Sequence, residues 1–307
     1  MKNRLIKTLN IKRFKLVLLL EGLLVGILAG LVIVGYRICL TNGALWLQRI
    51  LAYCKQSIFT IIIWFVILFV IALVVTKLLD WESLISGSGI PQLEGELAGK
   101  IDAKWWRVLI AKFFGGFLAN FSGLALGREG PSIQLGAMVG KGIGKVLKRG
   151  KTEERYLLTC GASAGLAAAF HAPLAGVMFA LEEVHKHFSA PLLISVMTSS
   201  IAADYLMSSI LGMAPVFSFN IHGTLPTQYY WMVIILGIIL GLLGAFYNKA
   251  LLFVQSLYNH SKHLNNYTKL LIPFILAGIL GFTVPQLLGS GDTLVDLLIE
   301  GKLTMSL

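Results

Sequence analysis

Charged residues are scarce in this 307-residue chain. They make up 13% of it, whereas a soluble domain usually carries about a quarter. Hydrophobic residues reach 56%, and the mean hydropathy is +0.79. The solvent for most of such a chain is lipid rather than water. The composition therefore excludes an ordinary soluble domain and predicts an all-α polytopic membrane protein.

Cysteine is also rare, with three residues in or beside apolar segments, Cys39, Cys54 and Cys160. Their number and spacing fit neither a disulfide framework nor a metal site. His185 and His187 are two positions apart, and such positions do not share a helix face. The chain also has no serine–histidine or paired-aspartate arrangement for an intramembrane enzyme. The sequence therefore predicts no metal site, no cofactor and no enzymatic activity.

What the chain has in abundance is apolar runs long enough to cross a bilayer, which takes about 20 residues. The clearest two are residues 16–40 and 58–79. The less uniform ones are residues 105–126, 157–181, 192–213, 231–253 and 270–288. Together these runs predict seven to nine hydrophobic helices.

The formal net charge of +11 comes from basic residues that lie outside the apolar runs. They are not interleaved with exposed aromatics, so they do not indicate nucleic-acid binding. One group lies within residues 1–15 and another within residues 145–155. The positive-inside rule places both groups in the cytoplasm. We therefore expect a multi-pass protein of the cell (plasma) membrane with a cytoplasmic N-terminus, whose surroundings are the lipid bilayer.

An internal repeat is visible in the chain. The segment GILAGLVIVGY at residues 26–36 returns as GIILGLLGAFY at 237–247, and GSG at 87–89 returns at 289–291. Glycine-rich matches are common in membrane helices, but two matches in the same order at similar offsets favour a duplication. We expect a basic segment at residues 1–15, a first membrane repeat at 16–220 and a partial second repeat at 228–307.

The first motif that could bind a ligand is GSGIP, formed by Gly87, Ser88, Gly89, Ile90 and Pro91. Glycine frees the backbone to turn, and proline at the first helical position gives up an amide that would be unpaired anyway. A helix is therefore predicted to start here. Its free amides and positive dipole end attract an anion, and the serine hydroxyl adds an uncharged donor. The alternative is an ordinary interfacial turn.

The second motif is GREGP, formed by Gly127, Arg128, Glu129, Gly130 and Pro131, and it adds a carboxylate to the same design. A charge inside a membrane span is costly and is read as functional by default. The tethered carboxylate can occupy the position of a free anion beside the helix amides. Protonation would release it, which couples a proton to an anion. The alternative is a salt bridge between the arginine and the glutamate in a loop.

The third motif is GASAGLAAAFHAPLAG at residues 161–176, followed by Glu182 and Glu183. Its small residues are typical of closely packed membrane helices, and Pro173 breaks the run. One of the two carboxylates can relay protons between the interior and the cytoplasm; the alternative is a solvated helix end. His171, beside the break, is expected to bond a backbone carbonyl.

In this order, GSGIP, GREGP and GLAAAFHAPLAG followed by EE resemble the CLC family of chloride channels and chloride/proton antiporters, from about residue 16 to the end. The resemblance implies inverted repeats with broken helices at the midplane, chloride and protons as the transported partners, and a homodimer with a separate pore in each subunit. It also implies that Ser88 coordinates the central anion, that Glu129 is the external gate and proton acceptor, and that Glu183 is the inner proton station.

The resemblance also bears on the subtype. Serine in GSGIP is similar to chloride-selective members rather than to nitrate-preferring or fluoride-transporting ones, and Glu183 is typical of antiporters. The family's second half normally adds a GxFxP helix start and a tyrosine to the anion site, and this chain ends before either. Chloride/proton antiport is the leading interpretation. A passive voltage-gated chloride channel and a non-transporting truncated remnant stay open. Either the chain is truncated, or a second polypeptide supplies the rest of the site.

Overall fold

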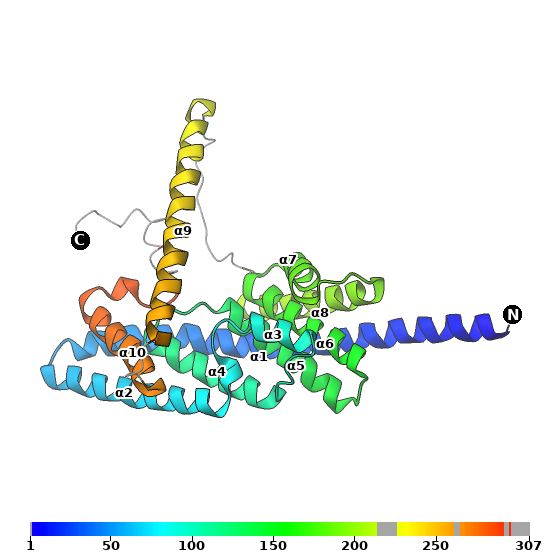
Figure 1. The fold of residues 1–307 in the computed structure, drawn as a ribbon, viewed down its shortest axis with the longest axis horizontal. Coiled ribbons are helices and arrows are strands. Elements are labelled where there is room, and N and C mark those ends of the chain that lie inside the picture. The colour runs from blue at the N-terminus through cyan, green and yellow to red at the C-terminus, as the bar shows by residue number, and fades with distance from the viewer. Residues whose placement is uncertain (1, 214–225, 261–264, 292–294, 296–307) are drawn as a thin grey trace.

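The described residues of this protein are helical. The computed structural model describes residues 2–213, 226–260, 265–291 and 295, with side chains from Phe14 onward except that of Asn259. Over these ranges the chain forms helices, turns and connecting segments, and it contains no β-strand. In Figure 1 the long N-terminal helix runs along the longest axis of the molecule, and several of the other helices pack against it. The all-α fold class is confirmed.

The helices differ in length. The long ones are α1 (Lys2–Cys54), α2 (Ile58–Trp81), α4 (Trp105–Phe121), α5 (Glu129–Val146), α6 (Lys151–Phe170), α8 (Ala190–Leu211), α9 (Tyr230–His260) and α10 (Asn266–Thr283). The short ones are α3 (Ile90–Leu97) and α7 (Pro173–Phe179), both with a proline in the first turn. Single turns are η1 (Ser83–Ile85), η2 (Ala180–His185), η3 (Thr227–Tyr229) and η4 (Pro285–Leu287).

Five of the described helices, α1, α2, α8, α9 and α10, are long and apolar enough to cross a membrane by length and composition. Two apolar runs of the sequence are divided differently in the structure. The run at 105–126 ends its helix at Phe121, and Gly123 then turns the chain with a φ of 86°. The run at 157–181 is split at His171, whose φ is 53°, into α6 and α7. The apolar pattern predicts these helices but not where they end.

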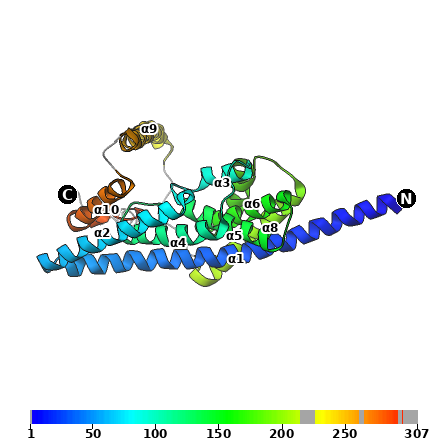
Figure 2. The ribbon, with the colours of Figure 1, turned by 60° about the horizontal axis from the view of Figure 1, so that its bottom comes forward.

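The core forms where α1 lies along α4, α5, α6 and α8 (Figure 2). Val25 and Ala29 of α1 are fully buried in it with Leu157 of α6. A Cβ added to Gly26 would come within 2.8 Å of the Cα of Ser199, closer than real Cβ atoms approach. Glycine on α1 therefore allows α8 to pack backbone against backbone.

Helices α5 and α6 pack at similarly short range. A Cβ added to Gly161 would lie 2.7 Å from the carbonyl carbon of Gly136. One added to Gly165 would lie 2.8 Å from the carbonyl carbon of Ser132. The small residues of the third motif thus occupy a helix contact that admits no side chain, which confirms the expectation of close packing. This contact fixes the position of α5, whose N-terminus carries the GREGP motif.

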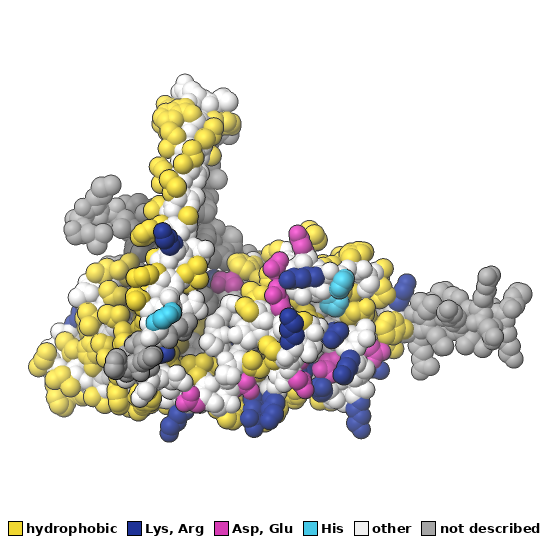
Figure 3. Space-filling view, viewed as in Figure 1, with side chains coloured by type: hydrophobic (Ala, Val, Ile, Leu, Met, Phe, Trp, Pro, Cys, Tyr) yellow, Lys and Arg dark blue, Asp and Glu magenta, His cyan; other side chains and the backbone are white. Residues whose placement is uncertain are grey.

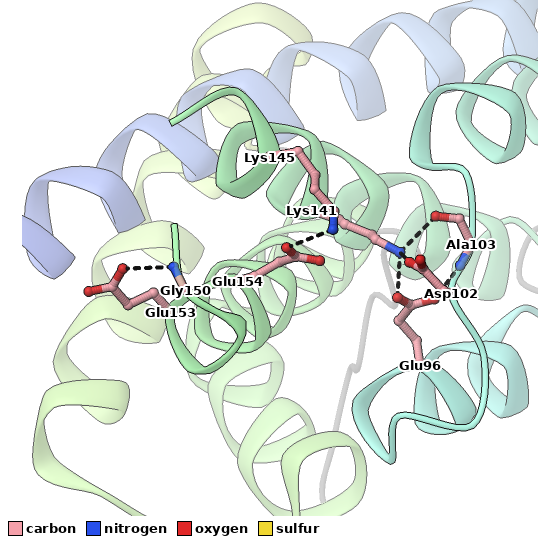
Figure 4. Close-up of polar contacts among 8 residues, drawn as sticks. All are labelled: Glu96, Asp102, Ala103, Lys141, Lys145, Gly150, Glu153 and Glu154. Carbon is pink, nitrogen blue, oxygen red and sulfur yellow. Dashed lines mark hydrogen bonds and ion pairs between the residues drawn. The ribbon is translucent and has the colours of Figure 1, made fainter. Parts of the chain in front are cut away.

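A buried lysine on α5 ties this helix to the segment that follows α3. Lys141 is 0% exposed. Its ammonium donates to the carboxylates of Glu96 and Asp102 and to the carbonyl of Ala103, the last two at 2.7 Å (Figure 4). The hydrogen bond and charge of Lys141 lower the pKa of the Asp102 carboxyl. Because a buried charge is costly unless it is paired and hydrogen-bonded, this cluster holds α3 against α5.

Helix α9 stands away from the core in Figure 1 and exposes apolar side chains along its length. None of its most apolar 18-residue window is buried. A helix that is apolar all round requires lipid or protein around it. Its surface therefore agrees with a multi-pass membrane protein.

The glycines of both GSG segments have positive φ. Gly87 and Gly89 have φ values of 70° and 94°, and Gly289 and Gly291 have values of 77° and 87°. Positive φ is a conformation that glycine adopts without steric cost. The likeness supports the proposed repeat. The boundary at residue 220 lies outside the described residues, so the division into residues 1–15, 16–220 and 228–307 stays a prediction.

Candidate anion-binding site

Helix α3 begins inside the GSGIP motif, as the sequence predicts. Gly89 takes the left-handed conformation at the N-cap, and Pro91 lies in the first turn. The amide of Ile90 donates to the Ser88 hydroxyl oxygen at 3.4 Å, and no side chain caps the helix beyond this contact. The N-terminal amides of α3 and the hydroxyl of Ser88 are therefore gathered at one point.

Helix α5 begins at the glutamate of the GREGP motif. Arg128 is the N-cap and Glu129 the first helical residue. A side-chain oxygen of Glu129 lies 3.7 Å from Nε of Arg128, and the glutamate side chain is 37% exposed. The hydroxyl of Ser132 donates to the carbonyl of Arg128 at 2.8 Å, which fixes the first turn. A carboxylate at this position is stabilised by the positive end of the helix.

The two helix starts meet. A Cβ added to Gly130 would lie 2.7 Å from the carbonyl oxygen of Ser88 and 3.0 Å from its Cβ. The first turn of α5 is thus in contact with the residue that precedes α3. Two helix N-termini, each with partial positive charge, therefore meet at Ser88, and Glu129 is the residue before Gly130. Such an arrangement can hold a small anion or, in its place, the carboxylate itself.

Two polar side chains that the motif analysis does not single out hold this arrangement together. Lys112 of α4, which is 4% exposed, donates to the carbonyls of Ile85 and Gly87 at 2.8 Å and 2.7 Å. Gln134 of α5 donates to the carbonyl of Leu84 at 2.9 Å. Both brace the segment that leads into α3. The signal for Lys112 was a cation within an apolar run, which membrane helices admit only for a reason.

Replacing Lys112 with methionine is expected to destabilise the fold by on the order of 2–4 kcal/mol, because two buried carbonyls lose a charged donor. The matched control is Lys145→Met, whose half-exposed pair with Glu154 at 3.2 Å should contribute at most about 1 kcal/mol. Thermal unfolding of the purified variants in detergent measures the difference. Equal melting temperatures for the two variants would contradict the bracing role of Lys112.

The third candidate residue lies on another element. Glu183 belongs to η2, a π-helical turn that follows α7, and its side chain is exposed, as is that of Glu182. This turn packs against α3, and Lys186 just beyond it pairs with Glu94 of α3 at 3.1 Å. The structure therefore brings Ser88 into contact with Gly130, the residue after Glu129, and places Glu183 on a separate turn that packs against α3.

A cavity of about 610 Å³ adjoins the GREGP motif. It is lined by Arg128 together with residues of α1 and by the second GSG segment, residues 289–291. The second GSG segment and the N-cap of α5 therefore border the same cavity. Arg128, which lines this cavity, is the residue before Glu129 in the chain.

The histidine of the third motif has partners that the sequence did not indicate. His171 Nε2 lies 3.0 Å from Nη1 of Arg37, and its Nδ1 lies 3.3 Å from Oγ of Ser208 and 3.5 Å from Oδ1 of Asp204. The expectation that His171 bonds a backbone carbonyl is wrong. Its left-handed C-cap conformation turns the ring toward polar side chains of α1 and α8. Among the described residues, no group of three His, Cys, Asp or Glu side chains could hold a metal ion.

Comparison with known families decides what kind of protein this is. A family model described as voltage gated chloride channel matches residues 69–307. The chain belongs to the CLC family. It is 37% identical over 229 residues to the H(+)/Cl(-) exchange transporter ClcA of Vibrio parahaemolyticus serotype O3:K6. This match covers 72% of the chain and 49% of the relative, so the chain spans about half the length of that CLC protein.

Solved CLC structures share the fold. A slow cyanobacterial Cl-/H+ antiporter superposes with a TM-score of 0.83 at 31% identity, over 91% of this chain and 67% of the antiporter. A eukaryotic CLC transporter gives 0.71 at 23% identity, over 92% and 52%. A CLC-type fluoride/proton antiporter gives 0.71 at 22% identity, over 92% and 69%. The last two likenesses support the fold alone, and together the three place this multi-pass membrane chain in the CLC architecture.

Proposed function

We propose that this CLC chain takes part in chloride/proton antiport, with Ser88 and the N-terminal amides of α3 and α5 as its anion site. The observation that carries the proposal is the contact of Gly130 with Ser88, which joins two helix N-termini. Backbone amides and a hydroxyl bind an anion without introducing a fixed positive charge that would retain it. Further support comes from relatives named as chloride/proton exchangers.

Glu129 is proposed as the gate and proton acceptor. Its carboxylate is attached to the first residue of α5, so it competes with chloride for the same amides. Protonation removes its negative charge and weakens its hold on the helix end, which lets chloride enter. Each exchange of the carboxylate for chloride then accompanies the uptake or release of a proton. Nε of Arg128 lies 3.7 Å from this carboxylate in the structure.

Glu183 is proposed as the inner proton station. Protons must reach Glu129 without passing through the chloride site, and an exposed carboxylate on η2 is accessible to water on the side that we assign to the cytoplasm. The basic residues between α5 and α6 lie on that side by the positive-inside rule. We also propose a location in the cell (plasma) membrane, a cytoplasmic N-terminus and a homodimer.

A passive chloride channel is the second candidate, since the matching family model is described as a voltage gated chloride channel. The two candidates differ at Glu183. A channel conducts chloride down its gradient and needs no inner proton acceptor, whereas an antiporter depends on one. The substitution Glu183→Gln, which keeps the size of the side chain and removes its titration, therefore separates them.

The experiment records chloride efflux and pH together from liposomes that contain the chain. We expect outward chloride flow to drive protons inward against their gradient, and Glu183→Gln to reduce this proton movement by about 100-fold while chloride efflux continues. The neighbouring substitution Glu182→Gln is the control and should leave both fluxes unchanged.

The other possible outcomes of this experiment are interpreted as follows. Chloride efflux without proton movement in the unsubstituted chain would favour the channel. Absence of both fluxes from protein that is folded and inserted would contradict transport by this chain on its own. Equal loss of proton movement in the Glu182 and Glu183 variants would contradict the specific role of Glu183.

A further inference from the structure

A second cavity, of about 820 Å³, opens along α3, with Pro91 of its first turn and Leu97 at its end among the lining residues. Its walls come from three elements: α3 and the segment after it, the first turns of α6, and the turn η2 with the residues beyond it. Figure 3 shows basic, histidine and acidic side chains gathered on this part of the surface. In the same view, the surface over α2 and α9 is mostly hydrophobic. Neither Ser88 nor Glu129 lines this cavity.

The fixed charges in this cavity are mainly positive. Lys100, Arg155 and Lys186 line it, and Glu94 is the carboxylate among the lining residues. Glu94 is already paired with Lys186 at 3.1 Å. The charges of Lys100 and Arg155 are therefore not balanced by another lining residue. Because like charges in one cavity repel each other, a bound anion would relieve this repulsion.

Tyr156 and His185 also line the cavity. Tyr156 packs against the ring of His185 with centroids 5.5 Å apart, and Nδ1 of His185 lies 3.0 Å from the hydroxyl of Thr159. Burial, followed by the charges of His187 and Arg155, lowers the pKa of His185. This shift favours the neutral imidazole. The positive character of the cavity thus rests on the lysines and the arginine.

We propose that this cavity is a binding site for a phosphate group, carried either by a soluble molecule or by a lipid headgroup. A volume of about 820 Å³ far exceeds that of a halide and suits a larger anion. Arginine presents a planar fork of donors that matches two phosphate oxygens, and lysine adds a point charge. Arg155 and Lys100 come from α6 and from the segment after α3, so one phosphate would bridge the two elements.

The alternative explanation of these cations is the general excess of lysine and arginine on the cytoplasmic side of membrane proteins. That excess does not require the charges to converge on one cavity. If this excess were the whole explanation, any two cationic side chains in this region would contribute equally to anion binding. Lys104 and Lys151 are exposed, lie close in the chain to Lys100 and Arg155, and do not line the cavity, so they provide the comparison.

The test compares the double variant Lys100→Ala/Arg155→Ala, which leaves the pair of Glu94 and Lys186 intact, with Lys104→Ala/Lys151→Ala. Both remove two positive charges. In the soluble arm, calorimetry measures pyrophosphate binding to the chain in nanodiscs of phosphatidylcholine alone. In the lipid arm, native mass spectrometry counts phosphatidylglycerol retained from a mixture with phosphatidylcholine. We expect at least about tenfold weaker binding in the cavity variant alone.

Binding in the soluble arm assigns the phosphate to a free molecule, and binding in the lipid arm assigns it to a headgroup. Absence of binding in both arms overturns the proposal, and so does an equal loss in the two double variants. The measurements do not involve transport, so they are independent of the proposed antiport. If the alanine variant does not fold, Lys100→Gln/Arg155→Gln replaces it, with Lys104→Gln/Lys151→Gln as its control.

Discussion

Substitution of Glu129 by glutamine is expected to reduce chloride-driven proton movement by about 100-fold while chloride still crosses the membrane. Glutamine has the shape of the protonated glutamate but cannot lose a proton. It also lacks the negative charge that the N-terminus of α5 stabilises. The anion site would therefore stay accessible to chloride at every pH. Chloride efflux and pH recorded from the same liposomes measure both effects.

The control for this prediction is Glu153→Gln, in the first turn of α6. That carboxylate likewise lies at a helix N-terminus, where its oxygen accepts a hydrogen bond from the Gly150 amide at 3.3 Å. It is remote from the contact of α3 with α5 in the chain and should leave proton coupling unchanged. Proton movement that persists in Glu129→Gln would show that another group carries the proton and would contradict the proposed gate.

Substitution of Gly161 by valine is expected to prevent correct folding. The added Cβ would lie 2.7 Å from the carbonyl carbon of Gly136. This carbon belongs to the backbone of a packed helix and cannot move aside as a side chain can. Overpacking usually costs about 1–3 kcal/mol when side chains can move aside, and here they cannot. Helices α5 and α6 would have to separate, which would also displace the start of α5. The fraction of monodisperse protein after purification measures the loss.

Gly237→Val is the control for the packing prediction. Gly237 lies in the interior of α9, and an added Cβ there meets no atom within 4 Å among the described residues. The change in helix propensity from glycine to valine is similar at the two positions, so the difference between the variants isolates the contact between α5 and α6. Comparable yields of folded protein from both variants would mean that the two helices do not pack as closely as the structure has them.

Sequence reasoning located the helix starts because their signals are local. Gly89 and Pro91 specify a turn followed by a first helical turn without reference to the rest of the fold. The same holds for Glu129, which lies at the first position of α5. What these signals do not contain is the contact between Gly130 and Ser88. That contact depends on how α4 and α5 pack. The chain contains many glycines, and nothing in the sequence distinguishes Gly130 as the one that contacts Ser88.

The supporting polar groups were harder to predict. Lys112 interrupts an apolar run, which indicates a buried role, but its carbonyl partners at Ile85 and Gly87 are 27 and 25 positions away in the sequence. His171 shows the opposite case. Its place beside a helix break suggests a backbone partner, yet its ring meets Arg37, a residue 134 positions away. Long-range partners of buried polar groups are set by helix packing, which a single sequence does not specify.

The central claim is that the N-termini of α3 and α5 jointly bind chloride. The most direct test is the anomalous diffraction of bromide, a heavier substitute for chloride, in crystals of the purified protein. The account predicts a peak within hydrogen-bonding distance of the Ser88 hydroxyl and of the first amides of α5, and loss of this peak in Gly130→Val. Well-ordered bromide elsewhere in the molecule, with none between Ser88 and Gly130, would contradict it.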